Sequence, residues 1–170
     1  MIDVPAVLKC VEELLQRGSY SSCAAVTRSV DQATGHMIVD VHPTNPDAAA
    51  MRLRCADSKV ILFFGQGAVF EVPQGGRRYT SLDLCGEVSA LCEAVLQGAF
   101  EEMVYFRKEQ VVGARALVLT ADGTAHETWF SLRSILLRKE ARHFRYLPYL
   151  PCKADVSGSR CEAHVPCQKM

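Results

Sequence analysis

The period of the hydrophobic pattern changes at Gly98, and this change constrains the fold more than any other feature of the sequence. Before this glycine, apolar residues recur at three- and four-residue spacing, which is typical of one face of a helix. After it, apolar and polar residues alternate as in a strand. Thr80 and Asp83 can form a capping box, and Gly98 can adopt the left-handed conformation that ends a helix. The predicted apolar stripe of this helix consists of Leu84, Val88, Leu91, Cys92 and Val95.

Three antiparallel strands are predicted after this helix. Residues 100–107 alternate in polarity, a turn follows at 108–110, and residues 111–119 contain a second apolar run. Asp122-Gly123 is the strongest short hairpin signal in the chain and leads into a third strand at 124–132. The segment from Thr80 to Leu132 therefore predicts one helix lying across a three-stranded meander.

The N-terminal half repeats this order of helix and strands. A helical stripe over residues 4–15 has Asp3 near its cap, Pro5 in its first turn and Gly18 after its end. Two hairpins and a further strand are predicted after it, in residues 23–30, 36–42, 49–55, 59–64 and 68–72. Strands and helices do not alternate, so we predict an α+β fold with a mostly antiparallel sheet of about 7–8 strands packed by two amphipathic helices.

The C-terminal part has weaker signals. The spacing of Leu132, Ile135 and Leu136 predicts a short basic C-terminal helix that continues to His143. The segment from Tyr146 to Pro151 repeats a three-residue unit that favours an extended course. We predict a single domain over residues 1–150 and a flexible tail that contains cysteines over residues 151–170.

Length and composition are typical of an ordinary globular protein. The chain has 170 residues, of which 49% are hydrophobic and 22% charged, enough for one domain with a sizeable core. Acidic residues interrupt the first sixteen positions, which excludes a secretory signal there, and no window approaches the roughly 18 apolar residues of a membrane span. We predict a cytoplasmic protein, in which most of the eight cysteines would be reduced thiols.

Charge is distributed unevenly although the formal net charge is zero. Residues 133–170 hold eight Lys and Arg against three Asp and Glu, which leaves 11 against 16 in residues 1–132. This asymmetry is compatible with a basic tail that only improves solubility, or with an acidic docking face on the body of the protein. The acidic body and the absence of a recognised module argue against nucleic-acid binding.

The best candidate for a metal site is in the tail. Three thiols and an imidazole occur there at a spacing that could enclose a tetrahedral zinc ion, although the spacing differs from that of common zinc knuckles. The alternative is a tail whose cysteines have no role. The candidate ligands are Cys152, Cys161, His164 and Cys167.

Motifs for catalysis are lacking in the sequence. No nucleophile elbow is present, and the histidines are dispersed over different predicted elements. Gly65-Gln66-Gly67 follows an apolar strand, as a phosphate loop does, but no helix begins there, so we predict a hairpin turn. Glu101 and Glu102 are adjacent in a strand and should point to opposite faces, which argues against an acid and base pair.

We therefore predict a non-enzymatic protein-binding module, for which an immunity or antitoxin role is an analogy from size and charge. A homodimer formed through a strand edge or residues 146–151 is a further option. The predicted partner-binding residues are Asp83, Glu87, Glu93, Glu101 and Glu102. The alternative is a small-ligand-binding or enzyme fold with a pocket between the sheet and the main helix, lined by Tyr105, Arg115, His126 and Trp129.

Overall fold

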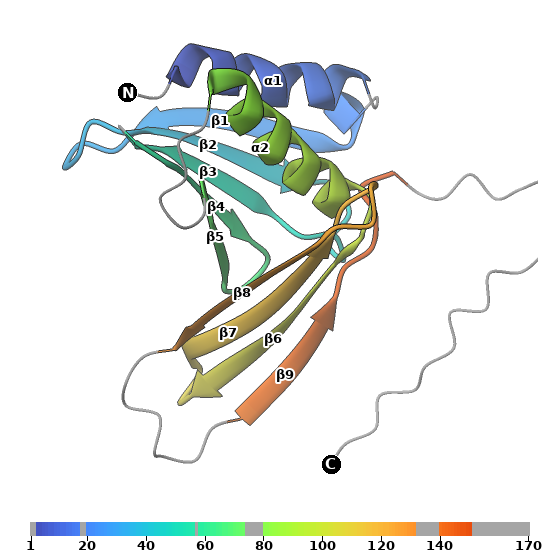
Figure 1. Cartoon of the computed structure of the whole chain (residues 1–170). Helices are drawn as coiled ribbons and strands as arrows, with labels where there is room; N and C mark the ends of the chain where they lie inside the picture. The colour runs from blue at the N-terminus through green and yellow to red at the C-terminus, as the bar shows by residue number, and fades with distance from the viewer. Residues whose placement is uncertain (1–2, 18–19, 57, 74–79, 132–139, 151–170) are drawn as a thin grey trace, which may run out of the picture.

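The computed structural model describes residues 3–17, 20–56, 58–73, 80–131 and 140–150. In this part of the chain two α-helices and nine strands form an α+β protein with two antiparallel sheets (Figure 1), which confirms the predicted class. The helices are α1 (Val4–Arg17) and α2 (Ser81–Leu96), and a 3-10 helix, η1 (Tyr20–Ser22), follows α1. The strands are β1 (Ala24–Val30), β2 (Met37–Pro43), β3 (Met51–Cys55), β4 (Val60–Phe64), β5 (Ala68–Val72), β6 (Phe100–Arg107), β7 (Gln110–Leu119), β8 (Ala125–Ser131) and β9 (Glu140–Arg145).

The first sheet is a meander in the order β1-β2-β3-β4-β5. Both predicted hairpins belong to it, and each strand pairs with the next along the chain. Strands β3, β4 and β5 bury every second residue, as expected when one face of a sheet packs on a core. The side chains on that face include Leu53, Leu62 and Phe70, which are almost fully buried.

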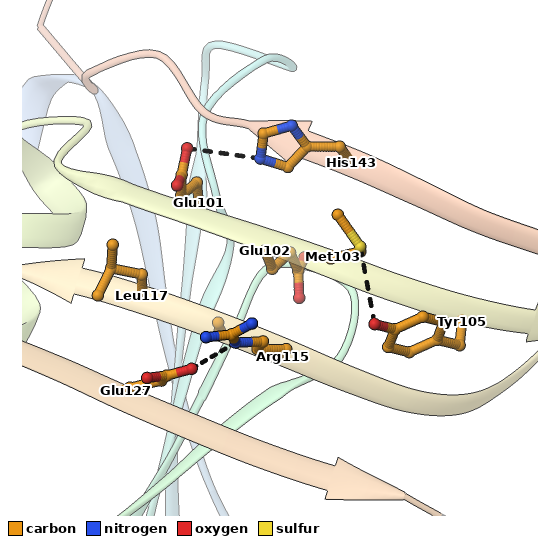
Figure 2. A pocket seen from close by; sticks show the side chains of 9 residues that line it. Glu101, Glu102, Met103, Tyr105, Arg115, Leu117, Glu127 and His143 are labelled. Carbon is orange, nitrogen blue, oxygen red and sulfur yellow. Dashed lines mark hydrogen bonds and ion pairs between the residues drawn. The ribbon is translucent and has the colours of Figure 1, made fainter. Parts of the chain in front are cut away.

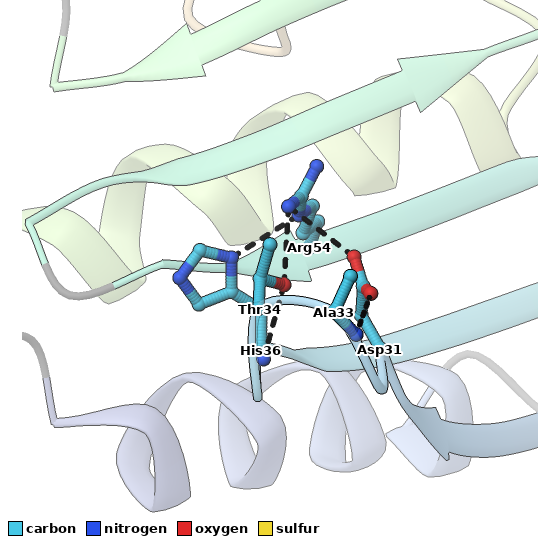
Figure 3. Close-up of polar contacts among 5 residues, drawn as sticks. All are labelled: Asp31, Ala33, Thr34, His36 and Arg54. Atoms are coloured by element: carbon cyan, nitrogen blue, oxygen red, sulfur yellow. Dashed lines mark hydrogen bonds and ion pairs between the residues drawn. The ribbon is translucent and has the colours of Figure 1, made fainter.

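The turn between β1 and β2 is fixed by a side chain from the third strand. Arg54 donates from Nε to Nδ1 of His36 at 3.2 Å and from a terminal nitrogen to Oγ1 of Thr34 at 3.2 Å, and it pairs with Asp31 at 3.3 Å (Figure 3). The carboxylate of Asp31 also accepts from the backbone N–H of Ala33 at 3.0 Å. Hydrogen bonds from Thr34 and Ala33, followed by the charge of Arg54, lower the pKa of Asp31.

The second sheet has the order β8-β7-β6-β9. Strands β6, β7 and β8 form the predicted meander, and the fourth strand, β9, pairs antiparallel with β6. The sequence prediction of a short basic helix that continues to His143 was wrong for residues 140–143, which belong to β9, and the first part of that prediction lies outside the described residues. Ala141, His143 and Arg145 alternate with Arg142 and Phe144, so this stretch can place one set of side chains on each face of a sheet. The nine strands of the described residues also exceed the seven or eight predicted, and they form two sheets where the sequence predicted one.

The helices lie next to each other over one face of the first sheet (Figure 1). The predicted caps at both ends of α2 and at the start of α1 are present, whereas Gly18, predicted to follow α1, lies outside the described residues. Thr80 and Asp83 form a capping box at the start of α2, and Gly98 follows its end with a φ of 77°. At α1, the side chain of Asp3 accepts from the backbone N–H of Ala6 at 3.1 Å. The predicted stripe of α2 is buried, including Val88 and Leu91 at the centre of the core.

The two sheets meet where β5 lies beside β8. Thr128 Oγ1 donates to the backbone carbonyl of Val69 at 2.6 Å across this junction. A series of aromatic rings also connects the sheets, with centroid separations of 5.5, 5.8, 5.1 and 6.3 Å between successive members. In order, the rings are Phe70, Phe64, Phe100, Tyr146 and Phe144.

A buried carboxylate holds the β4–β5 turn of the first sheet against β6 of the second. Glu102 is 1% exposed, and its carboxylate accepts from the backbone N–H groups of Gln66 at 2.6 Å and Gly67 at 3.0 Å. The hydroxyl of Tyr146, just after β9, donates to the same carboxylate at 2.5 Å. Burial and this hydrogen bond raise the pKa of Tyr146, so its hydroxyl remains protonated and able to donate.

The conformation and surroundings of this turn explain why residue 65 is a glycine. Gly65 has a φ of 59°, and a Cβ built there would overlap Glu102 and lie 2.5 Å from the hydroxyl oxygen of Tyr146. The predicted hairpin turn is therefore confirmed, and its backbone amides do bind an anion. That anion is the carboxylate of the chain's own Glu102.

Replacing Glu102 by alanine is expected to lower the free energy of unfolding by about 3 kcal/mol, because buried N–H and O–H donors would lose their acceptor. Urea denaturation followed by circular dichroism measures this change. The matched control is Glu101→Ala on the opposite face of β6, which removes only exposed ion pairs and should cost less than about 1 kcal/mol. Equal losses for the two variants would contradict the role assigned to Glu102.

The β7–β8 turn contains a second well-bonded carboxylate. Asp122 accepts from the hydroxyl of Thr120 at 2.7 Å, and from the backbone N–H and hydroxyl of Thr124, each at 3.0 Å. These hydrogen bonds, with that of Thr120 the largest contribution, lower the pKa of Asp122 from 3.8 to about 2. Gly123 completes the predicted turn with a φ of 82°.

Because the pKa of Asp122 is lower in the folded state than in the unfolded state, its contribution to stability is complete above pH 3.8 and is lost as the pH falls through about 2. We expect a carboxyl ¹³C titration by NMR to place the Asp122 midpoint near 2. The amide resonance of Thr124 should shift over the same pH range and lose that dependence in Asp122→Asn. A midpoint at or above the ordinary value of 3.8 would contradict these hydrogen bonds.

Candidate functional site

The outward face of the second sheet is the best candidate for a functional surface. On β6, Phe100, Glu102 and Val104 point inward and are buried, so the residues between them point outward. The strand register places the outward residues of all four strands on one surface. We call this surface the open face, and it comprises Glu101, Met103, Tyr105, Arg115, Leu117, Leu119, Glu127, Trp129, His143 and Arg145.

One row of the open face crosses all four strands. Met103 on β6 is paired with His143 on β9 and with Arg115 on β7. Arg115 is in turn paired with Trp129 on β8. Since directly paired residues of adjacent strands have neighbouring Cβ atoms, these four side chains form a continuous row.

A cavity of about 270 Å³ opens on this face (Figure 2). Its lining includes Met103, Tyr105, Arg115 and Leu117, with carboxylates and His143 around them. The hydroxyl of Tyr105 is in hydrogen-bonding contact with the sulfur of Met103 at 3.7 Å. The cavity is a depression in the surface of the sheet, so it can contact a side chain or a small ligand without a change of fold.

The charged groups of the open face are paired with one another. Arg115 forms an ion pair with Glu127, and the hydrogen bond from Arg115 Nε, followed by the charge of Glu127, raises the pKa of Arg115. Glu101 pairs with Arg145 at 3.2 Å and lies 3.4 Å from Nε2 of His143. Each arginine therefore has a carboxylate beside it, and the face carries almost no net charge.

Large apolar side chains on the open face remain accessible to solvent. Trp129 is 68% exposed, and Met103 and Leu117 are each 38% exposed. Leu119, at the end of the same face, is also exposed. Such a group of exposed apolar side chains on one surface is a feature of binding sites rather than of a plain solvated face.

The structure does not bring the five predicted partner-binding carboxylates together. Glu101 lies on the open face, whereas Glu102 is buried behind it and bound by the β4–β5 turn. Asp83 belongs to the capping box of α2, where hydrogen bonds from Thr80 lower its pKa. Glu93 of α2 accepts from the side chain of Gln97 at 3.2 Å. The remaining predicted residue, Glu87, lies half-buried on α2.

Three of the four predicted pocket residues share the open face. Tyr105 and Arg115 line its cavity, and Trp129 lies next to Arg115 in the register. His126 is on the opposite side of the sheet, because it pairs with the fully buried Val118. The cavity is thus on the face that points away from the core, and not under α2 as the sequence predicted.

The row also includes His143, which the sequence pattern did not indicate as a site residue. His143 was assigned to a helix, and its position beside Met103 depends on the pairing of β9 with β6. The alternation of residues 140–145 was the available signal, but the run is short and follows a segment with helical spacing.

The segment after β9 is packed within its own chain. Tyr146 donates to Glu102, and the buried Tyr149 donates from its hydroxyl to the carbonyl of Ala49 at 2.6 Å. The backbone N–H of Tyr149 donates to the carbonyl of Leu96 at 2.9 Å. These contacts leave less of the segment free for the pairing with a second copy that the sequence suggested.

Within the described ranges, no group of three or more His, Cys, Asp or Glu side chains is arranged to hold a metal ion. The predicted zinc ligands, Cys152, Cys161, His164 and Cys167, all lie outside those ranges, so that prediction is untested. In the same described part of the chain, neither helix has the length and apolar composition needed to cross a membrane.

Comparison with known proteins found no match to any family model, curated protein or solved structure.

Proposed function

We propose that this chain is a non-enzymatic protein-binding module whose open face contacts a folded protein partner. The observation that supports this proposal best is the exposure of Trp129, Met103 and Leu117 on one sheet face, beside Tyr105 and Arg115. Trp, Tyr, Met and Arg are the residue types enriched in protein interfaces. Trp, Tyr and Arg also contribute most often to binding energy.

The pairing of charges on the open face narrows the class of partner. Nucleic acids bind surfaces with an excess of Lys and Arg, whereas Arg115 and Arg145 each have a carboxylate partner here. A strongly basic partner would need unpaired carboxylates, and Glu101 and Glu127 are both engaged. A partner with an apolar centre and a mixed polar rim fits this surface better.

The layout of the open face resembles the usual anatomy of an interface. Its apolar centre comprises Met103, Leu117 and Trp129, and ion pairs lie next to it. Interfaces commonly have a dry centre that contributes most of the affinity and a polar rim that sets orientation. An immunity or antitoxin role is one function of this general kind and remains a proposal by analogy.

A small ligand in the cavity is the alternative function. The cavity of about 270 Å³ lies at the lower limit of sites for small molecules, which typically measure about 300–1,000 Å³. Its lining combines Arg115, His143 and carboxylates with Tyr105, which would suit a small polar molecule with an apolar part. We favour a protein partner because Trp129 and Leu119 extend the exposed apolar surface beyond the cavity.

To test the proposal, the full-length protein is purified gently from its own host and weighed by native mass spectrometry, and its partner is identified. The Kd for that partner is then measured by calorimetry for the parent protein and for Trp129→Ala. We expect the Kd to increase at least about 30-fold, the effect of a residue that contributes roughly 2 kcal/mol. Because Trp129 is mostly exposed, the stability of the variant should change little.

Leu82→Ala is the matched control. Leu82 is an apolar residue that is 85% exposed on α2, outside the open face, so its replacement should leave the Kd unchanged. If both Trp129→Ala and Met103→Ala bind the partner with the Kd of the parent protein, the proposal is contradicted. A protein that carries a stoichiometric small molecule, lost in Arg115→Ala, would instead support the cavity function.

A further inference from the structure

One edge of the first sheet is open in the described part of the chain. The two sheets meet where β5 lies beside β8, so β1 is the strand of the first sheet that lies farthest from the second sheet (Figure 1). β1 pairs with β2 on one side, and no described strand pairs with its other side. The side chains of residues 25–30 are exposed on both faces of the sheet. Both the backbone edge and the side chains of β1 are therefore accessible to a partner.

The hydrogen bonds at the two ends of β1 identify the backbone groups that point to the open edge. The carbonyl of Cys23 accepts from the N–H of Thr44 at 2.8 Å, and the N–H of Asp31 donates to the carbonyl of His36 at 2.9 Å. Successive residues of an antiparallel strand bond to alternate sides, so the odd-numbered residues of β1 bond to β2. The N–H and C=O groups that face the open edge belong to Ala24, Val26, Arg28 and Val30.

The apolar face of the first sheet continues onto β1, where nothing described covers it. Val26 is paired with Val41, which is fully buried, yet Val26 itself is 39% exposed. Val30 is paired with Met37, which packs against the core, and Val30 is 55% exposed. Since directly paired residues of antiparallel strands point to the same face, both valines extend the core surface to the open edge.

β1 lacks the features that normally protect an open edge. Such edges commonly carry lysine, proline or a bulge, which prevent pairing with another chain. β1 has no lysine or proline, and its register with β2 is continuous over all seven residues. Its one charged residue, Arg28, forms an ion pair with Glu12 of α1, so this charge is neutralised within the chain. By contrast, the outer strand of the second sheet, β9, carries Glu140, Arg142 and Arg145 among its six residues.

We propose that the open edge of β1 pairs antiparallel with β1 of a second copy of this chain, so that two first sheets join into one continuous sheet across a two-fold axis. Full overlap of the two strands places Thr27 on the axis, opposite the same residue of the second copy. In this register Ala24 lies opposite Val30, and Val26 lies opposite Arg28. The inference does not depend on the proposed binding function, because the open face belongs to the second sheet.

This register is the reason to assign the edge to a second copy. It pairs even-numbered residues with one another, so every outward N–H of one copy meets an outward C=O of the other. It also places Arg28 opposite Val26, so no like charges are directly paired, and the aliphatic stem of the arginine can cover the valine. A register centred on Arg28 would instead place two guanidinium groups opposite each other. A foreign strand would have to supply this complementary pattern, whereas a second copy contains it.

Analytical ultracentrifugation of the full-length protein, under reducing conditions and over a range of concentrations, tests the dimer. We expect the mass to increase with concentration from that of one chain to that of two. Val26→Lys places a positive charge opposite Arg28 of the second copy, and the change occurs twice in the dimer. The Kd of the dimer should therefore increase at least about 10-fold. Leu82→Lys is the matched control, because it adds the same charge at an exposed apolar position of α2 and should leave the Kd unchanged.

A disulfide cross-link tests the register. Thr27 and the same residue of the second copy would form a non-hydrogen-bonded pair, whose Cα atoms lie about 4.5 Å apart, within the range of a disulfide. Mild oxidation of Thr27→Cys should therefore give a covalent dimer, joined at position 27 when its peptides are mapped by mass spectrometry. Ser29→Cys is the matched control on the same face of β1. Its two copies would be four residues out of register and about 13 Å apart, too far for a disulfide.

Other outcomes would overturn the proposal. One is a protein that remains a single chain at every concentration. Another is a dimer that Val26→Lys leaves intact and Trp129→Ala separates, because that dimer would use the open face. Cross-linking of Ser29→Cys as efficient as that of Thr27→Cys would overturn the register. If Val26→Lys fails to fold, the two cysteine variants decide the question, because they change only exposed side chains of β1.

Discussion

The fold depends on one buried carboxylate that joins the two sheets. Glu102 lies on β6 of the second sheet, yet its oxygen atoms are bound by backbone amides of the β4–β5 turn in the first sheet and by the hydroxyl of Tyr146. Burying a charged group is costly unless hydrogen bonds replace its hydration. Here the turn, β6 and the segment after β9 must be assembled together to supply these bonds. The carboxylate therefore specifies how the sheets are arranged, in addition to the non-directional packing of the aromatic rings.

This arrangement also determines what the second sheet exposes. Since Glu102 and its neighbours Phe100 and Val104 point inward, Glu101, Met103 and Tyr105 must point outward. The helices cover the first sheet and contribute to the same core as the inward residues of β7, so the opposite face of the second sheet remains free among the described elements. The surface proposed for binding is a direct consequence of which side of β6 is anchored.

The sequence predicted those features whose causes are local. The capping box at Thr80, the glycine stop at Gly98 and the Asp122-Gly123 turn each depend on a few adjacent residues, and all were confirmed. Strand β9 was missed because its stability comes from pairing with β6, about forty residues earlier, whereas the spacing of the preceding segment favours a helix.

For the candidate site, alternation alone shows that Glu102 shares a face with Phe100 and Val104. The prediction that Glu102 binds a partner rested on its charge and did not take this alternation into account. The register that joins Tyr105, Arg115, Trp129 and His143 is a tertiary property and could not be read from any one segment.

The turn at Gly65 has a consequence for how this protein can change during evolution. Three residues that are distant in the sequence meet at this turn: Gly65, Glu102 and Tyr146. A side chain at position 65 would occupy the space of the Glu102 carboxylate and the Tyr146 hydroxyl. Loss of the carboxylate would in turn leave the amides of Gln66 and Gly67 without an acceptor. Each of the three positions therefore restricts which residues the other two can accept. In related chains they should be retained together or replaced together, and their covariation would identify this sheet arrangement where overall sequence similarity is no longer detectable.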